Sequence, residues 1–263
     1  MPKENATPKR QRTRKALILI SFLLFPITIY YFSPVVIVMA ARLGIINGSF
    51  IMFALLFISS LVLGRGFCGW VCPGGGLAEV CSMARDKEAP GGRLNWIKYF
   101  IWVPWIGVIA WFAISAGGYS VIDPLYQTYY GISVHGAESY IVYFSFTALI
   151  AILAWFPGRR GFCHYLCWMA PFMVIGDWLR YKIGWPALQL KAQSQECVQC
   201  GKCAGNCPMS LDVPALVKSG SMRHTECILC GTCVDNCSNS AITFAWKTQK
   251  NPSRGRVGTG QGS

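Results

Sequence analysis

The segment GRGFCGWVCPGG, residues 64–75, places an arginine and two cysteines at the end of a long uncharged run. That run, residues 43–64, has the length of about 20 residues that a helix needs to cross a bilayer. Ninety-five residues further on, RRGFCHYLCWMAP, residues 159–171, follows another uncharged run in the same way. Two cysteine pairs, Cys68/Cys72 and Cys163/Cys167, therefore occupy matching positions in two copies of one motif.

Four uncharged runs predict an α-helical integral membrane protein. The chain has 263 residues, of which 53% are hydrophobic and 13% are charged. The runs are residues 16–41, 43–64, 99–122 and 139–158. A soluble protein with four buried helices is the alternative, but soluble helices rarely stay apolar on all sides for so long. We therefore expect four transmembrane helices.

The placement of positive charge predicts the orientation in the membrane. If the N-terminus is cytoplasmic, Arg42 is the only one of the 24 Lys and Arg residues on the outer side. Such an asymmetry sets the orientation of membrane proteins. We expect a multi-pass protein with both termini in the cytoplasm, and we read the basic residues before the first run as an orientation signal or a contact with lipid headgroups. The net charge of +13 then points to the membrane and not to nucleic acid.

The two motif copies predict an internal repeat. Residues 65–68 and 160–163 have the same sequence, Arg-Gly-Phe-Cys, and an amphipathic stretch follows each copy, at 77–85 and 171–182. We expect these stretches to be helices that lie in the membrane interface. Because the second and fourth spans run in the same direction, the repeats should be parallel and related by an axis along the membrane normal.

The strongest signal is a pair of cysteine runs near the C-terminus. The segments CVQCGKCAGNCP and CILCGTCVDNCS both have the spacing C-x2-C-x2-C-x3-C. In bacterial two-cluster ferredoxins the first three cysteines of a run hold one [4Fe–4S] cluster and the fourth ligates the other cluster. A zinc site, the alternative, closes with four ligands that usually form two C-x2-C pairs, and has no use for a further cysteine three residues on. The predicted ligands are Cys197, Cys200, Cys203 and Cys237 for one cluster, and Cys227, Cys230, Cys233 and Cys207 for the other.

The C-x3-C pairs predict a third redox site at the inner membrane surface. On a helix, residues four apart share a face, so each pair would act as a two-thiolate clamp. The four thiolates could hold a shared [4Fe–4S] cluster, which we favour, or a single metal ion or smaller cluster; inert buried thiols are the remaining alternative. The candidate ligands are Cys68, Cys72, Cys163 and Cys167.

Residues near the pairs have predicted supporting roles. Arg65 and Arg160 would offset thiolate charge, and His164 would hydrogen-bond a ligand and tune the site. Cys81 has no counterpart in the second copy and is predicted to be a core thiol. With three histidines and no C-x-x-C-H sequence, bound haem is disfavoured.

The predicted organisation has four parts. Residues 1–15 form a basic cytoplasmic N-terminus, and residues 16–188 form the four-span membrane domain with its motifs at 64–75 and 159–171. Residues 189–246 form a two-cluster ferredoxin-like α+β domain. The Gly- and Ser-rich residues 247–263 are predicted to be disordered.

Taken together, these motifs resemble the NapH/NosR-type membrane polyferredoxins over roughly residues 10–245. The resemblance implies an electron-transfer subunit of a quinol dehydrogenase in a bacterial or archaeal cytoplasmic membrane. It would relay electrons between the membrane quinone pool, its [4Fe–4S] clusters and a redox partner protein. The chain departs from the family where Trp168 follows Cys167 in place of proline.

The same motifs are compatible with two other functions. The chain could be an iron–sulfur assembly or metal-reducing factor for a membrane or periplasmic metalloenzyme, or a membrane redox sensor. The larger family members have an extracytoplasmic flavin-binding domain to which no part of residues 1–263 corresponds, so we expect partners to complete an electron-transfer circuit. The sequence contains no acid–base pattern that identifies catalytic residues.

Overall fold

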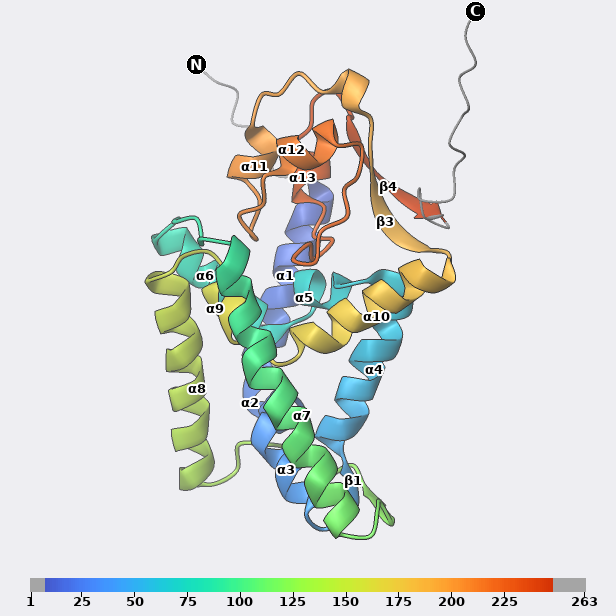
Figure 1. Ribbon diagram of the computed structural model, residues 1–263. Helices are drawn as coiled ribbons and strands as arrows, with labels where there is room; N and C mark the ends of the chain where they lie inside the picture. The colour runs from blue at the N-terminus through green and yellow to red at the C-terminus, as the bar shows by residue number, and fades with distance from the viewer. Residues whose placement is uncertain (1–7, 248–263) are drawn as a thin grey trace, which may run out of the picture.

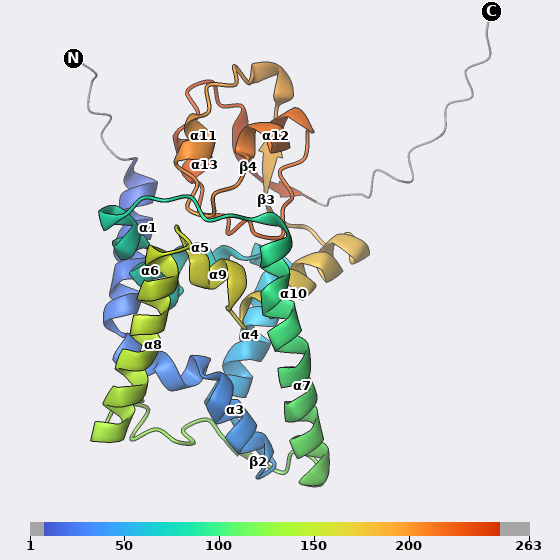
Figure 2. The same ribbon diagram turned by 60° about the vertical axis from the view of Figure 1, so that its left-hand side comes forward.

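The computed structural model describes residues 8–247, and the described chain is mainly helical. Long helices make up one part of the molecule, and the cysteine-rich C-terminal domain sits on one end of them (Figure 1). The loop between helices α7 (Ile97–Ser115) and α8 (Ala137–Trp155) lies at the opposite end (Figures 1 and 2).

The first uncharged run does not form one straight helix. It is divided among α1 (Lys9–Leu23), α2 (Phe25–Thr28), η1 (Ile29–Phe32) and α3 (Pro34–Ala41), with a bend of 58° after α1. Pro26 and Pro34 explain the breaks, because proline lacks an N–H and its ring clashes with the preceding turn. The Ser33 hydroxyl then caps α3 by accepting hydrogen bonds from the N–H groups of Val35 and Val36.

The second uncharged run forms a helix shorter than expected. It contains β1 (Ile45–Asn47) and α4 (Gly48–Leu63). The buried Asn47 side chain accepts a hydrogen bond from the N–H of Phe50 at 3.0 Å, which fixes the start of α4. With 16 residues, α4 is about 24 Å long, less than the roughly 30 Å of the hydrocarbon core.

Two helices among residues 8–247 are long and apolar enough to cross a membrane. One is Gly92–Ser115, in which η2 (Gly92–Trp96) continues into α7 (Ile97–Ser115), and the other is α8 (Ala137–Trp155). The bent pair that begins with α1 would be a third span if it crosses as one unit. The helices themselves therefore give two candidate spans, or three with the bent pair, and the prediction of four spans is not confirmed; prolines divide the first run, and α4, which begins after the Asn47 cap, has 16 residues.

The two motif copies form matching elements. Short helices α5 (Gly66–Trp70) and α9 (Gly161–Tyr165) each begin one residue after the motif arginine. They are followed by α6 (Pro73–Ala84) and α10 (Ala170–Ile183). Helix α10 packs against α4 and α6 packs against α8, so the helix after each motif contacts the helix before the other motif. This reciprocal packing brings α5 and α9 to the middle of the molecule, below the C-terminal domain (Figure 1).

The C-terminal domain combines a small sheet with short helices, as expected. Strand β3 (Ala187–Ala192) pairs antiparallel with β4 (Ile242–Lys247), and a second small sheet, at the far end of the molecule, pairs β1 in parallel with β2 (Val121–Asp123). The domain's helices are η3 (Ser194–Glu196), α11 (Lys202–Gly205), α12 (Val213–Lys218) and α13 (Thr232–Asp235). Apart from Lys247, the predicted tail 247–263 lies outside the described residues. At the other end of the chain, α1 runs across the boundary predicted at residue 15.

Candidate metal centres

The cysteines of the C-terminal domain gather around two cavities. Each cavity is lined by three cysteines of one run and the fourth cysteine of the other run. One cavity is lined by Cys197, Cys200, Cys203 and Cys237, and the other by Cys227, Cys230, Cys233 and Cys207. All thirteen cysteines lie in the described part of the chain and are free thiols.

The two cysteine runs wrap their cavities with matching backbone turns. Gly201 and Gly231 have φ of 73° and 75° and stand directly before α11 and α13. The middle residues Gln199 and Leu229 also have positive φ, at 53° and 50°. Left-handed conformations of non-glycine residues are uncommon and tend to occur at functional sites. Because the same unusual backbone conformation occurs in both runs, we infer that each loop turns tightly around its cavity.

The second cavity is electrostatically suited to a cation. Burial, followed by the neighbouring sulfurs of Cys230, Cys227 and Cys207, raises the pKa of the Cys233 thiol. Burial likewise raises the pKa of Cys227 to about 12. Thiolates this close together are stable only when positive charge offsets them, as bound iron would.

The four cysteines of the C-x3-C motifs also come together, and all four are buried. Burial, and then the sulfurs of Cys68, Cys163 and Cys167, raise the pKa of the Cys72 thiol well above its ordinary value of 9.0. The sulfurs of one motif copy are therefore close enough to repel those of the other. Among residues 8–247, no three His, Cys, Asp or Glu side chains are arranged to hold a single metal ion.

The expectation that each pair shares one helical face is wrong. Helix α5 ends at Trp70, and Cys72 has an extended conformation (φ −62°, ψ 120°) directly before α6. Pro73 explains the break, because the residue before a proline is pushed out of the helical region. Cys72 thus lies at the N-terminus of α6, where the N–H of Gly75 favours the anionic sulfur, and Cys167 receives the same help from the N–H of Ala170.

The motif arginines lie near the four sulfurs, with Arg65 near Cys68 and Cys167 and Arg160 near Cys163 and Cys72. Arg160 pairs with Glu79 at 2.6 Å and donates to the Cys68 carbonyl oxygen at 2.7 Å. Arg65 pairs with Glu226 at 2.9 Å. Within residues 8–247, Nε and Nη2 of Arg65 and Nε of Arg160 are buried without a hydrogen-bond partner. Buried N–H groups need acceptors, and the sulfur atoms of a bound cluster would supply them, so this donor set fits an iron–sulfur group.

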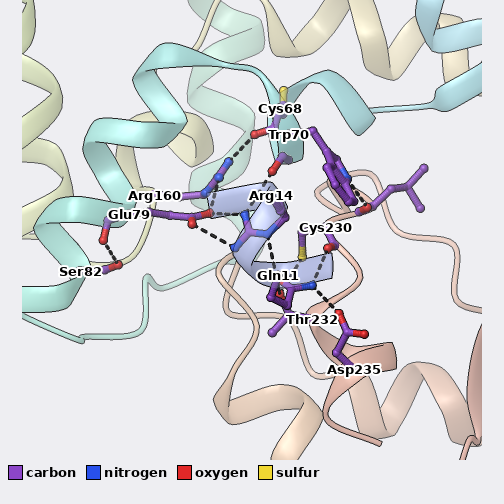
Figure 3. A network of polar contacts seen from close by, with 12 residues as sticks. Gln11, Arg14, Cys68, Trp70, Glu79, Ser82, Arg160, Cys230, Thr232 and Asp235 are labelled. Atoms are coloured by element: carbon purple, nitrogen blue, oxygen red, sulfur yellow. Dashed lines mark hydrogen bonds and ion pairs between the residues drawn. The ribbon is translucent and has the colours of Figure 1, made fainter. Parts of the chain in front are cut away.

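Sequence reasoning missed the buried charges that support these arginines. Glu79 also binds Arg14 at 2.7 Å, and Glu226 binds Lys98 at 2.5 Å (the Glu79 network is drawn in Figure 3). Burial would raise the pKa of Glu226, but Arg65 and Lys98 outweigh that effect and lower it to about 2. The sequence does hint that Glu79 has a buried partner. It is the only acidic residue between Glu4 and Asp86, and it lies in an apolar stretch.

His164 and Cys81 have different surroundings. The buried His164 places Nδ1 3.0 Å from Oδ1 of Asn95, and in the described chain its Nε2 has no partner. Burial lowers the pKa of His164 to about 4, so the imidazole is neutral at pH 7. Its predicted tuning role stays a prediction. Cys81 is half-buried on α6 and packs at the edge of the hydrophobic core.

The C-x3-C group directly contacts the second cysteine run. A Cβ on Gly69, the residue after Cys68, would lie 2.4 Å from the carbonyl oxygen of Ile228, so only glycine permits this approach. The indole N–H of Trp70 donates to the Leu229 carbonyl oxygen at 3.1 Å. From α1, Gln11 donates to the Cys230 carbonyl oxygen at 3.1 Å (Figure 3). The basic N-terminal segment thus contacts the C-terminal domain, in addition to the role as an orientation signal predicted for it.

Two protein families match the cysteine-containing segments. The 4Fe–4S binding domain family matches residues 48–88 and 140–186, which contain the two C-x3-C motifs. The 4Fe–4S dicluster domain family matches residues 196–242, which contain both ferredoxin-type runs. The chain therefore carries 4Fe–4S-binding domains, as expected from its cysteines.

Several known proteins are similar to the chain at 24–27% identity. YccM of Escherichia coli (strain K12), named as a candidate electron transport protein, is 24% identical over 64% of this chain and 48% of its own length. An uncharacterised protein of Methanocaldococcus jannaschii is 26% identical over 60% of this chain and 64% of its own length. The regulatory protein NosR of Stutzerimonas stutzeri is 27% identical over 66% of this chain and 24% of its own length. The chain thus spans less than two thirds of these relatives, and no solved structure matches it.

Proposed function

Because the chain belongs to the NapH/NosR-type family of 4Fe–4S proteins, we propose that it is a membrane-bound iron–sulfur electron-transfer protein. It would relay electrons between the membrane quinone pool, its clusters and a redox partner protein. Cys197, Cys200, Cys203 and Cys237 would hold one [4Fe–4S] cluster, and Cys227, Cys230, Cys233 and Cys207 would hold a second. Cys68, Cys72, Cys163 and Cys167 would share a third cluster or metal site. When bound, such clusters supply one-electron transfer.

One observation carries this proposal: the three cysteine groups form a continuous series. The C-x3-C group contacts the loop of the second run through Gly69 and Trp70. Exchange of the fourth cysteines, Cys207 and Cys237, joins that run to the first one. The series extends from the helical domain into the C-terminal domain, which is the path that an electron relay needs.

The protein's own residues would position and insulate the third group. The N-termini of α6 and α10 direct N–H groups at Cys72 and Cys167, and Arg65 and Arg160 place positive charge beside the four sulfurs. Burial of all four sulfurs excludes water. Together these contacts would stabilise thiolates in a site that burial alone keeps as neutral thiols.

The membrane arrangement is part of the proposal. We infer four membrane-crossing segments in two parallel repeats, with both termini in the cytoplasm. The reciprocal packing of α10 on α4 and of α6 on α8 supports the repeat. The family match to both motif-containing segments supports it as well.

Anaerobic reduction by a quinol tests the function. Purified protein is mixed with a short-chain quinol, and bleaching of the iron–sulfur absorbance is followed. We expect the wild type to be reduced by quinol, and Cys68→Ala to be reduced by dithionite but not by quinol, because the relay is interrupted at its membrane end. Cys81→Ala is the matched control and should behave as the wild type.

Iron and sulfide content checks the shared third site in the same samples. Cys68→Ala and Cys163→Ala should each lose the same cofactor, and the double variant should lose no more than either single one, because the residues belong to one site. Separate and additive losses would reject the shared site. Quinol reduction that survives Cys68→Ala would reject the relay.

A sensor function is the second candidate, because one relative, NosR, is named a regulatory protein. A sensor would carry clusters that change oxidation state without sustained transfer to a partner. Multiple turnovers between quinol and an electron acceptor protein would exclude it.

A further inference from the structure

A basic cavity lies between α10, strand β3 and the loops of the C-terminal domain. Among the described residues that line it, Arg65, Arg180, Arg223 and Lys247 are cations and Asp177 is the one carboxylate. The cavity borders the second cysteine run at Cys227 and Leu229, and it is also lined by Arg65, which lies beside the C-x3-C sulfurs. The charge of its lining favours an anionic ligand.

Asp177 is shared by Arg180 and Arg223, and both arginines keep N–H donors that a ligand could use. Arg180 pairs with Asp177 at 2.5 Å and also donates to the Leu188 carbonyl oxygen. Arg223 is 3.9 Å from Asp177, at the limit of an ion pair. Since a guanidinium has five N–H donors, these contacts use a minority of the donors of the two arginines.

The cavity is also shaped to present those donors. The Arg223 guanidinium stacks on the Tyr181 ring at 3.8 Å, which fixes the plane of its donors. Gly64 lines the cavity, and a Cβ there would lie 3.2 Å from the Asp177 carboxylate and 3.3 Å from Nη2 of Arg180. A planar fork of N–H groups matches the oxygens of a phosphate group.

The helix that forms one wall has the character of a membrane-interface helix. Trp178, Ile183 and Trp185 are exposed along α10 and directly after it, although they are large and apolar. Tryptophan is enriched at headgroup level, and basic pockets on the cytoplasmic side of membrane proteins bind anionic lipid headgroups.

We propose that this cavity binds a phosphate group, supplied by the headgroup of an anionic phospholipid. The lipid source rests on the membrane position in the proposed function, whereas the phosphate chemistry rests on the cavity alone. Bound there, the headgroup would hold the C-terminal domain against the membrane surface beside Cys227.

Isothermal titration calorimetry of the full-length, cluster-containing protein in a neutral detergent tests the proposal. The probes are inorganic phosphate and dihexanoylphosphatidylglycerol, and the variants are Arg223→Gln and Arg180→Gln. Arg93→Gln, at an exposed arginine outside the cavity, is the matched control. We expect each cavity variant to weaken binding about tenfold, because a charge-assisted hydrogen bond is lost, and the control to bind as the wild type does.

The two probes separate the sources of the phosphate. Tighter binding of the lipid than of inorganic phosphate supports the headgroup, while equal or weaker binding of the lipid overturns the lipid source and keeps a soluble phosphate compound. If neither probe binds, or if the cavity variants bind as tightly as the control variant, the site is overturned. Iron and sulfide content, measured on the same samples, reports the proposed function independently of the cavity.

Discussion

Individual residues decide how the buried charges near the sulfur groups are balanced. Glu79 is mostly buried and joins two arginines, Arg14 and Arg160, which are almost completely buried. Burial would raise the pKa of Glu79, but Arg160 and then Arg14 outweigh it and hold the pKa below the ordinary value of 4.5. Removing one partner of such a network leaves uncompensated buried charge, which costs far more than the network contributes when intact.

Glu79→Gln is therefore expected to destabilise the protein by about 3–5 kcal/mol at pH 7. A group with a lowered folded-state pKa contributes stability above its unfolded pKa, and that contribution is lost as the pH falls. The difference between variant and wild type should thus shrink as the pH falls below about 4.5, near the unfolded pKa of a glutamate. Thermal unfolding in detergent across this pH range measures it. The exposed Glu88→Gln is the control, and an equal loss in both variants would contradict the role of Glu79.

Cys207 gives a second prediction at the residue scale. It belongs to the first run but lines the cavity of the second. Cys207→Ser should therefore perturb the paramagnetic signal of the cluster held by Cys227, Cys230 and Cys233, with the other cluster intact. Electron paramagnetic resonance of the reduced protein measures this. Loss confined to the cluster of Cys197, Cys200 and Cys203 would show that the ligation is not crossed.

At the element scale, short helices next to prolines and glycines place the functional groups. Helix α5 ends before Cys72 because of Pro73. Cys72, the second cysteine of the motif, therefore lies at the N-terminus of α6. Contact between α5 and the second cysteine run depends on the missing side chain of Gly69. The junction between the two domains is therefore set by the backbone of a five-residue helix.

Gly69→Ala should disturb this junction without removing a ligand. The added Cβ would lie 2.4 Å from the Ile228 carbonyl oxygen, so the loop must move away. We expect iron content to stay near that of the wild type and quinol-dependent reduction to slow about tenfold or more, because misplacement by about 1 Å can have large kinetic effects. Stopped-flow absorbance measures the rate. Gly107→Ala on α7, where a Cβ meets nothing within 4 Å, is the control, and equal rates in the two variants would contradict the role of the junction.

On the scale of the whole molecule, the two ends differ in composition and in what they carry. The cysteine-rich domain occupies one end, and the loop between α7 and α8 occupies the other (Figures 1 and 2). That loop, residues 116–136, contains no Lys or Arg. A membrane crossed by α7 and α8 would therefore separate a basic end that carries the cysteines from a tyrosine-rich end whose loop has no Lys or Arg and one carboxylate, Asp123.

Reporter fusions test this orientation. A fluorescent protein fused after Ser263 should be active, because it folds in the cytoplasm. An alkaline phosphatase inserted near Gly131 should be active as well, because it needs the outer compartment. The reverse pattern would place the cysteine-rich domain outside and remove the argument that its thiols lie in a reducing compartment.

The sequence by itself determined the features that depend on local spacing. The cysteines that the C-x2-C-x2-C-x3-C spacing groups together, with Cys207 and Cys237 exchanged, line the two cavities, because a short loop leaves its cysteines few arrangements; their role as cluster ligands stays a prediction. The repeated Arg-Gly-Phe-Cys motif likewise indicated that Cys68 and Cys163 belong together. The uncharged runs at residues 99–122 and 139–158 overlap the helices at residues 97–115 and 137–155, although the first run extends past the end of its helix.

Only the tertiary structure decided which distant residues meet. No spacing pattern links Glu79 to Arg160 or Glu226 to Lys98, because these pairs form through the packing of helices far apart in the chain. The same is true of the basic cavity, whose cations come from four separate segments. Composition also did not show how the first two uncharged runs divide into helices, since hydrophobicity alone does not reveal the breaks at Pro26 and Pro34 or the cap at Asn47. The spacing of cysteines along the chain can be read from the sequence. The pairing of buried charges cannot, because it depends on how distant segments pack in the complete fold.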